Sequence, residues 1–121
     1  MKLAILLTAT IKVQVLQGNF SAEERMQMYS STLHYYSKVI GHRYPIVFLE
    51  NSDYDLYELR QEFEGKLDIE FIQLHPNGDI PFEPSKGKGY NEYLMIGGGL
   101  DKSEKLCSCT HFLKITGRYP M

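Results

Sequence analysis

The stretch Leu3-Ala-Ile-Leu-Leu-Thr-Ala-Thr-Ile11 decides the fold class of this chain. Nearly all of its residues are apolar or β-branched, which is typical of a strand buried on both faces in a parallel sheet. A second apolar run at 45–49 and a third at 111–116 predict further strands. Residues 67–74 alternate between apolar and polar side chains, which predicts a half-exposed strand at the edge of the sheet.

Helical patterns lie between these strands. Ser21 and Glu24 form a capping box that predicts a helix start, and Gly41 is expected to end that helix. A second helix is expected to present Leu56, Leu59 and Phe63 on one face and to end at Gly65. A third is expected from residue 89 or 90 to about 105, with a break or kink at the glycines 97–99. Its expected inward side chains are Tyr90, Tyr93, Leu94 and Leu100.

Strands and helices alternate along the chain, so the sequence predicts a Rossmann-like α/β fold. We expect an open, mainly parallel four-stranded sheet flanked by three helices, with residues 1–121 forming a single domain.

Composition limits the function. A net charge of -2 argues against a nucleic-acid partner, since such surfaces are basic. The apolar run at 1–7 is too short for a signal peptide, and no run reaches the roughly 18 apolar residues of a membrane span, so a cytoplasmic protein is expected. Cys107 and Cys109 are spaced neither as a zinc site nor as a redox pair, and are expected to be reduced thiols.

Ligands of parallel sheets bind outside the carboxyl ends of the strands. The turns expected there comprise residues 8–10, 50–53, 75–89 and 116–119, which together offer hydroxyls, carboxylates and cations suited to a nucleotide. The glycine turn before the third helix would also favour a phosphate at the helix N-terminus. The candidate binding residues are Thr8, Ala9, Thr10, Glu50, Ser52, Asp53, Lys86, Gly87, Lys88, Gly89, Asn91, Lys114 and Arg118.

Several of these residues have a plain structural alternative. Asp53 could simply cap the second helix, and the glycines 87 and 89 could only permit a tight loop. The lysines 86 and 88 could be solvated charges, and Arg118 could pair with a carboxylate. Asp53 and Asp55 resemble an Asp-x-Asp metal motif, but we reject that interpretation because their expected place is the first turn of a helix. No histidine has a partner at a catalytic spacing, so no catalytic residue is predicted.

Taken together, the motifs resemble the N-terminal half of nucleotide-sugar-dependent glycosyltransferases of the GT-A fold, in the style of bacterial polysaccharide and lipopolysaccharide biosynthesis enzymes. Residues 7–11 are similar to the strand and turn that cup the base, and 46–53 to the strand that ends in an acidic turn. Residues 87–92 are similar to the segment beneath the diphosphate. The most specific match is 112–119, Phe-Leu-Lys-Ile-Thr-Gly-Arg-Tyr.

The resemblance implies binding of a nucleotide-sugar. In the family, the Asp-x-Asp metal site, the acceptor pocket and the catalytic base follow the last of these strands. We therefore expect weak binding without turnover and no cofactor in this chain, with Mn or Mg only in a full-length relative. A bare last strand further predicts a homo-oligomer through residues 111–116, or pairing with the missing C-terminal half.

Two other classes of function stay open. One is a non-enzymatic α/β interaction or regulatory domain. The other is a small phosphate- or nucleotide-binding enzyme of another doubly wound family, although the glycine turn lacks both the dinucleotide fingerprint and the P-loop pattern.

Overall fold

The computed structural model describes residues 2–11, 21–52, 54–74 and 87–116 and forms a four-stranded, all-parallel sheet with helices, so the predicted α/β fold is confirmed. The strands are ordered β3-β2-β1-β4. Their bounds are β1 Leu3–Ala9, β2 Ile46–Glu50, β3 Ile69–Gln73 and β4 His111–Thr116. The helices are α1 Ala22–Val39, α2 Tyr57–Phe63, α3 Gly87–Lys102 and α4 Glu104–Ser108.

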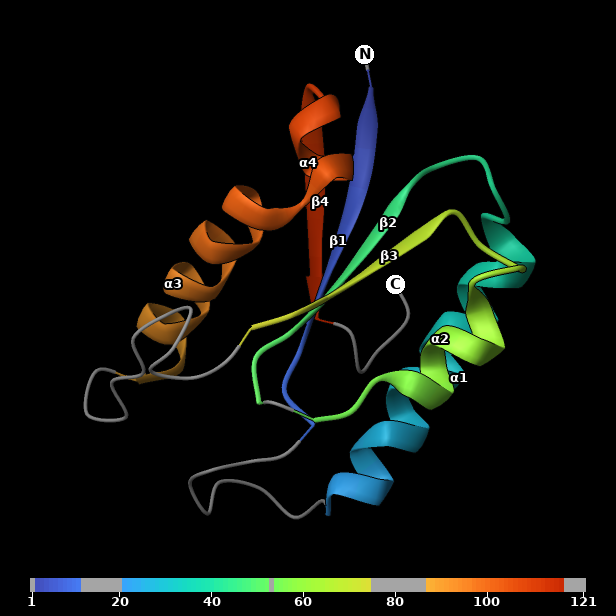
Figure 1. Cartoon of the computed structure of the whole chain (residues 1–121), viewed down its shortest axis with the longest axis horizontal. Helices are drawn as coiled ribbons and strands as arrows, with labels where there is room; N and C mark the ends of the chain where they lie inside the picture. The colour runs from blue at the N-terminus through green and yellow to red at the C-terminus, as the bar shows by residue number, and fades with distance from the viewer. Residues whose placement is uncertain (1, 12–20, 53, 75–86, 117–121) are drawn as a thin grey trace.

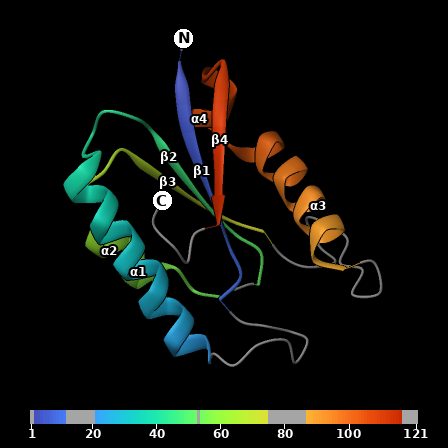
Figure 2. The ribbon, with the colours of Figure 1, turned by 180° about the vertical axis from the view of Figure 1, so that it is seen from behind.

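Two layers of helices enclose the sheet. Helices α1 and α2 cover one face, and α3 and α4 cover the other (Figures 1 and 2). The chain builds β2 and β3 on one side of β1 and then crosses over to add β4 on the other side. The first turns of α1 and α3 lie at the end of the sheet where the strands finish (Figure 1).

The core has one part on each face of the sheet, because successive side chains of a strand point to opposite faces. Toward α1 and α2, aromatic rings meet edge to face, with the Tyr29 and Phe48 ring centroids 5.6 Å apart. Toward α3 and α4, the buried set is smaller and mostly aliphatic: Ala4, Leu6, Val47, Leu49, Ile72, Leu74, Met95 and Leu106.

Helix α1 begins and ends as the sequence predicts. The Glu24 N–H donates to Ser21 Oγ at 3.2 Å, and the Ser21 N–H donates to Glu24 Oε1 at 3.3 Å. These reciprocal bonds satisfy N–H groups that a helix start leaves unpaired. Gly41 follows the C-terminal cap with a φ of 58°, a left-handed conformation that glycine adopts without strain.

The prediction of a break at the glycines 97–99 is wrong. Helix α3 runs through them to Lys102, and a separate α4 follows, so the described chain has four helices instead of the three expected. A Cβ built at Gly99 would lie 2.7 Å from Leu49 Cδ2. This glycine therefore serves close approach of the helix to β2, which offsets its poor helix propensity.

The expected inward face of α3 is also wrong in part. Tyr93 is 75% exposed and Leu100 is 41% exposed, whereas Met95 is buried. The stripe that meets the sheet runs through Glu92, Met95 and Gly99, which follow helical spacing. This stripe includes a carboxylate and a glycine. The positions of the large apolar residues therefore predict a different face of the helix as the inward one.

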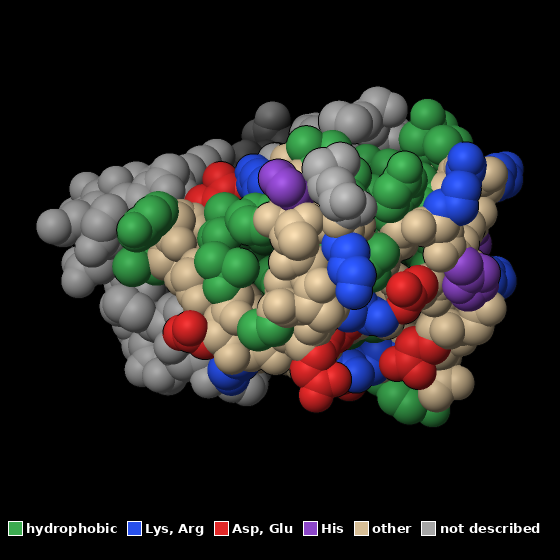
Figure 3. Space-filling model, turned by 90° about the horizontal axis from the view of Figure 1, so that it is seen from above, with side chains coloured by type: hydrophobic (Ala, Val, Ile, Leu, Met, Phe, Trp, Pro, Cys, Tyr) green, Lys and Arg blue, Asp and Glu red, His purple; other side chains and the backbone are tan. Residues whose placement is uncertain are grey.

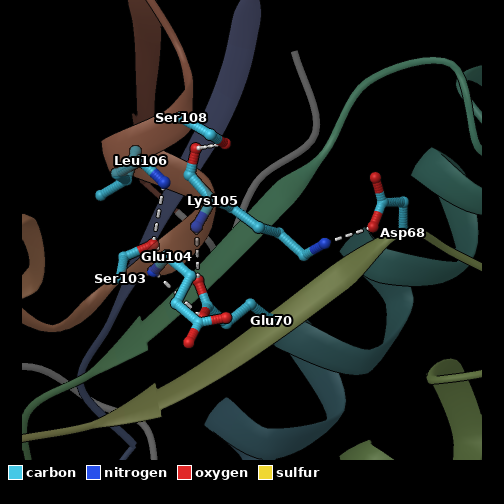
Figure 4. Close-up of polar contacts among 7 residues, drawn as sticks. All are labelled: Asp68, Glu70, Ser103, Glu104, Lys105, Leu106 and Ser108. Carbon is cyan, nitrogen blue, oxygen red and sulfur yellow. Dashed lines mark hydrogen bonds and ion pairs between the residues drawn. The ribbon is translucent and has the colours of Figure 1, made fainter.

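Helix α4 is fastened to β3 by a polar cluster (Figure 4). Glu70 accepts from the Ser103 hydroxyl at 2.6 Å and from the backbone N–H groups of Glu104 and Lys105 at 3.3 and 3.4 Å. Lys105 forms an ion pair with Asp68. Ser103 caps the helix by accepting from the Leu106 N–H at 3.0 Å. A new helix thus begins where α3 ends, because these groups satisfy its first N–H groups.

Helix α2 begins at Tyr57, so the expected first-turn position of Asp55 is wrong, and the alternative in which Asp53 caps this helix is not borne out. The N-terminal cap is Leu56, and the Tyr57 N–H donates to Asp55 Oδ1 at 3.0 Å. Asp53 itself lies outside the described residues.

Two alanine substitutions within α3 test the contact between this helix and the sheet. Gly99→Ala is expected to lower the free energy of unfolding by about 1–3 kcal/mol, because the new methyl group overpacks against Leu49. Gly97→Ala is the matched control, since nothing lies within 4 Å of its Cβ position. It should raise the free energy of unfolding by about 0.5–1 kcal/mol. Urea denaturation followed by circular dichroism measures both, and equal stability of the two variants would contradict the close approach.

Candidate functional site

The carboxyl ends of the strands form the rim where a ligand site is expected. The register pairs Ala9 with Glu50, Glu50 with Gln73, and Thr8 with Thr116, so the strands end at nearly the same level. The strand order reverses at β1, which places a topological switch point between β1 and β4. In open α/β sheets, ligands bind in the crevice at this point.

A buried carboxylate organises the β1–β2 part of the rim. Glu50 Oε1 accepts from the N–H groups of Ser52 and Tyr54 at 2.6 and 3.4 Å. Its Oε2 accepts from the Ile11 N–H at 2.8 Å and from the Ser52 hydroxyl at 2.5 Å. One side chain therefore holds the end of β1 and the turn after β2 in a fixed relation.

Burial raises the pKa of Glu50 above its ordinary value of 4.5, because the charged form loses water. The hydrogen bonds from the Ser52 hydroxyl and from the backbone of Ile11, Ser52 and Tyr54 oppose this shift without cancelling it. The folded chain consequently binds the Glu50 proton more tightly than the unfolded chain does. The stability gained from this group is fully present below pH 4.5 and is lost as the pH rises through the raised pKa.

Glu50→Gln tests this pH dependence. The variant should be less stable than wild type, because an amide offers one acceptor oxygen to a site lined with donors. The difference in free energy of unfolding should be largest below pH 4.5 and shrink as the pH rises through the raised pKa of Glu50. Urea denaturation at a series of pH values measures it. Glu58→Gln, an exposed change on α2, is the control, and a constant difference for Glu50→Gln would contradict the raised pKa.

Thr10 is the meeting point of three elements beside this carboxylate. Its hydroxyl donates to Asn51 Oδ1 at 2.6 Å, and its N–H donates to the Tyr29 hydroxyl oxygen at 2.9 Å. Arg25 is buried, and its Nη1 donates to the Thr10 carbonyl at 3.0 Å, while its Nε has no hydrogen-bond partner in the described part of the chain. This part of the rim is therefore a dense polar network around the end of β1.

A second cluster lies at the switch point itself. The Thr8 hydroxyl donates to Glu92 Oε1 at 3.1 Å, and Lys114 forms an ion pair with the same oxygen. These side chains come from β1, α3 and β4. The cluster thus joins the two strands that flank the crevice to α3, which belongs to the crossover from β3 to β4.

The structure brings many of the predicted site residues to the same rim. Thr8 and Ala9 lie in β1, Glu50 lies in β2 and Lys114 lies in β4. The sequence indicates turns for the first three of these residues, and the structure places them at the ends of strands instead. Thr10 and Ser52 follow their strands. The remaining predicted residues either lie in the first turns of α3, as do Gly87, Lys88, Gly89 and Asn91, or lie outside the described residues, as do Asp53, Lys86 and Arg118.

Sequence reasoning missed three residues of the rim. Arg25 was not predicted at the rim, whereas Asn51 and Glu92 lie inside the predicted segments 50–53 and 87–92 but were not chosen as binding residues. Strand pairing supplies the signal for Glu92, because Leu6 lies opposite Lys114 and Thr8 lies on the same face two residues on. Glu92, in the second turn of α3, is the carboxylate that can reach Lys114. The contact can be predicted only when it is known that β4 pairs with β1.

A pocket of about 300 Å³ lies at the other end of the sheet, lined by Lys2, Arg43 and Cys109 among others. The Arg43 side chain donates to carbonyl groups at the end of α1, so its charge already has partners. Figure 3 looks onto this end, where side chains of both charges are interspersed with hydrophobic ones. Parallel sheets bind ligands at the opposite end, which leaves the carboxyl rim as the candidate site.

Both cysteines are free thiols, as predicted.

Within the described ranges, no group of three or more His, Cys, Asp or Glu side chains is placed to hold a metal ion. Among the helices of the described part, none combines the length and the apolar character needed to cross a membrane.

Comparison with known proteins leaves the family of the chain open. No protein-family model, curated protein sequence or solved structure matches it. The glycosyltransferase resemblance therefore stays a hypothesis that rests on the sequence motifs.

Proposed function

We propose that this chain is a glycosyltransferase-like domain that binds a nucleotide-sugar at the carboxyl rim of its sheet. One observation carries the proposal: two polar clusters lie at the carboxyl rim of the sheet. Thr8 of β1, Glu92 of α3 and Lys114 of β4 contact one another at the topological switch point, and Glu50 of β2 holds Ile11 and Ser52 on the other side of β1. Ligand sites of open α/β sheets are found at this position. The proposal is for binding alone.

The two parts of the rim suit different parts of such a ligand. Asn51 and Thr10, both partly exposed, offer amide and hydroxyl groups beside β1 and β2, which match the hydrogen-bonding edges of a base and a ribose. Lys114 and the N-terminus of α3 supply positive charge beside β4, which suits a diphosphate.

Glu50 supports this division by preparing the base side of the rim. Three of its hydrogen bonds hold the backbone of Ile11, Ser52 and Tyr54 before any ligand arrives, and a fourth holds the Ser52 hydroxyl. A rim that is ordered in advance loses less conformational entropy on binding, which favours affinity. We therefore assign Glu50 to the scaffold of the proposed site, next to the residues that would touch the base.

Thermal shift and calorimetry with UDP-glucose, GDP-mannose and ADP-glucose, each with and without Mn²⁺, test the proposal. One of them should raise the melting temperature by several degrees, because a ligand at about 100 times its Kd stabilises the folded chain by about 2.7 kcal/mol. Lys114→Met should weaken that binding about tenfold or more through loss of a charged contact. Lys105→Met is the matched control, since Lys105 is also ion-paired but lies in α4, where it contacts Asp68. Absence of stabilisation by all three would refute the proposal.

We further propose that the chain associates with itself through β4. This strand is at the edge of the sheet, and Phe112 and Leu113 are exposed. The other edge differs, because Arg60 donates to the carbonyl of Phe71 in β3 at 3.1 Å and so occupies an edge acceptor. An exposed edge strand with apolar side chains is a template for pairing with a second copy.

Light scattering at tens of micromolar checks the association. Wild type is expected to be a dimer or larger, and Leu113→Lys should shift it toward the monomer because a charge on the edge opposes strand pairing. Tyr57→Lys, which changes an exposed residue of α2, should leave the size unchanged. A wild-type monomer would contradict the association without bearing on nucleotide-sugar binding.

A further inference from the structure

Glu92 joins β1 and β4 at the switch point through only one of its two carboxylate oxygens. Its Oε1 takes both the Thr8 hydroxyl and the Lys114 ammonium group. No hydrogen bond to its Oε2 exists within the described part of the chain. The side chain is 36% exposed and that of Lys114 is 29% exposed, so solvent reaches the pair.

The ion pair between Glu92 and Lys114 contributes little to the stability of the fold. Ion pairs near the surface contribute at most about 1 kcal/mol, because water and salt screen them. The position is specific, however, since the pair sits between β1 and β4 where the strand order reverses. A carboxylate, an ammonium group and a hydroxyl therefore lie together at the rim of a proposed ligand site.

The chemistry of the trio distinguishes two kinds of ligand. A carboxylate accepts hydrogen bonds from sugar hydroxyls but repels a terminal phosphate. Lys114 alone would attract the terminal phosphate of a nucleoside diphosphate, and Glu92 offsets that attraction by neutralising the ammonium charge. The pair as a whole should prefer a diphosphate whose outer phosphate is esterified to a sugar.

Building on the proposed function, we propose that Glu92 is a specificity-determining residue that accepts hydroxyl groups of the glycosyl part and disfavours the unglycosylated nucleotide. Thr8 and Lys114 position its carboxylate, and Oε2 is the acceptor presented to the ligand. The structure thus points to discrimination between a nucleotide-sugar and the nucleoside diphosphate that remains when the sugar is lost.

The test compares the matched pairs UDP-glucose and UDP, GDP-mannose and GDP, and ADP-glucose and ADP by calorimetry with the full chain. For the pair that binds wild type, Glu92→Gln should weaken nucleotide-sugar binding and strengthen diphosphate binding. The ratio of their Kd values should change by about tenfold in favour of the diphosphate, as expected for one charge-assisted hydrogen bond. Gln keeps an acceptor for Thr8, so the variant is expected to fold, and circular dichroism verifies this.

Glu62→Gln is the control for charge in general. Glu62 also contacts a basic side chain, with its Oε1 2.7 Å from His34 Nε2, but it lies on α2. Its substitution should leave the Kd ratio at the wild-type value. An equal change of both affinities in Glu92→Gln would show a purely structural role and overturn this inference while the proposed function stands. A ratio shift in Glu62→Gln of the same size would also overturn it. Failure of wild type to bind any of the six ligands would overturn both proposals.

Discussion

The central strand β1 is the constraint on which the other elements depend. It has a strand on each side and helices over each face, so its backbone and both rows of side chains are buried. Burial of a strand in this way requires every N–H and C=O group to be paired and every side chain to be apolar or hydrogen-bonded. Thr8, the polar exception in β1, satisfies the rule through Glu92.

Two carboxylates secure the carboxyl end of this strand from its two sides. Glu50 ties it to the turn after β2, and Glu92 ties it to α3 and, through Lys114, to β4. Each carboxylate has a different environment. Glu50 is buried with an elevated pKa, whereas Glu92 is partly exposed and keeps an oxygen for other contacts. The first is suited to support a site and the second to take part in one.

The helices show where sequence patterns succeed and fail. The capping box at Ser21 and the glycine at 41 are local signals, since the groups that satisfy one another lie within one or two turns of helix. The inward face of α3 is a different case. It depends on Gly99 fitting against Leu49 and on Glu92 reaching Thr8, and both partners lie far away in the chain. Hydrophobic periodicity favoured Tyr93 and Leu100, which are exposed, because it does not count a glycine or a partly exposed ion pair as an inward position.

The sequence by itself determined the parallel α/β class, the position of β3 at an edge and the bounds of β4, because these follow from local hydrophobic patterns. It also determined the rim as the place for candidate ligand residues, because parallel strands all end at the same side of the sheet. Only the tertiary structure decided that β4 lies beside β1, that α3 passes unbroken through three glycines, and that Glu50 and Glu92 organise the rim. The physical reason is that each of these features is a contact between residues distant in sequence, whose free energy appears only when the sheet has brought both partners together.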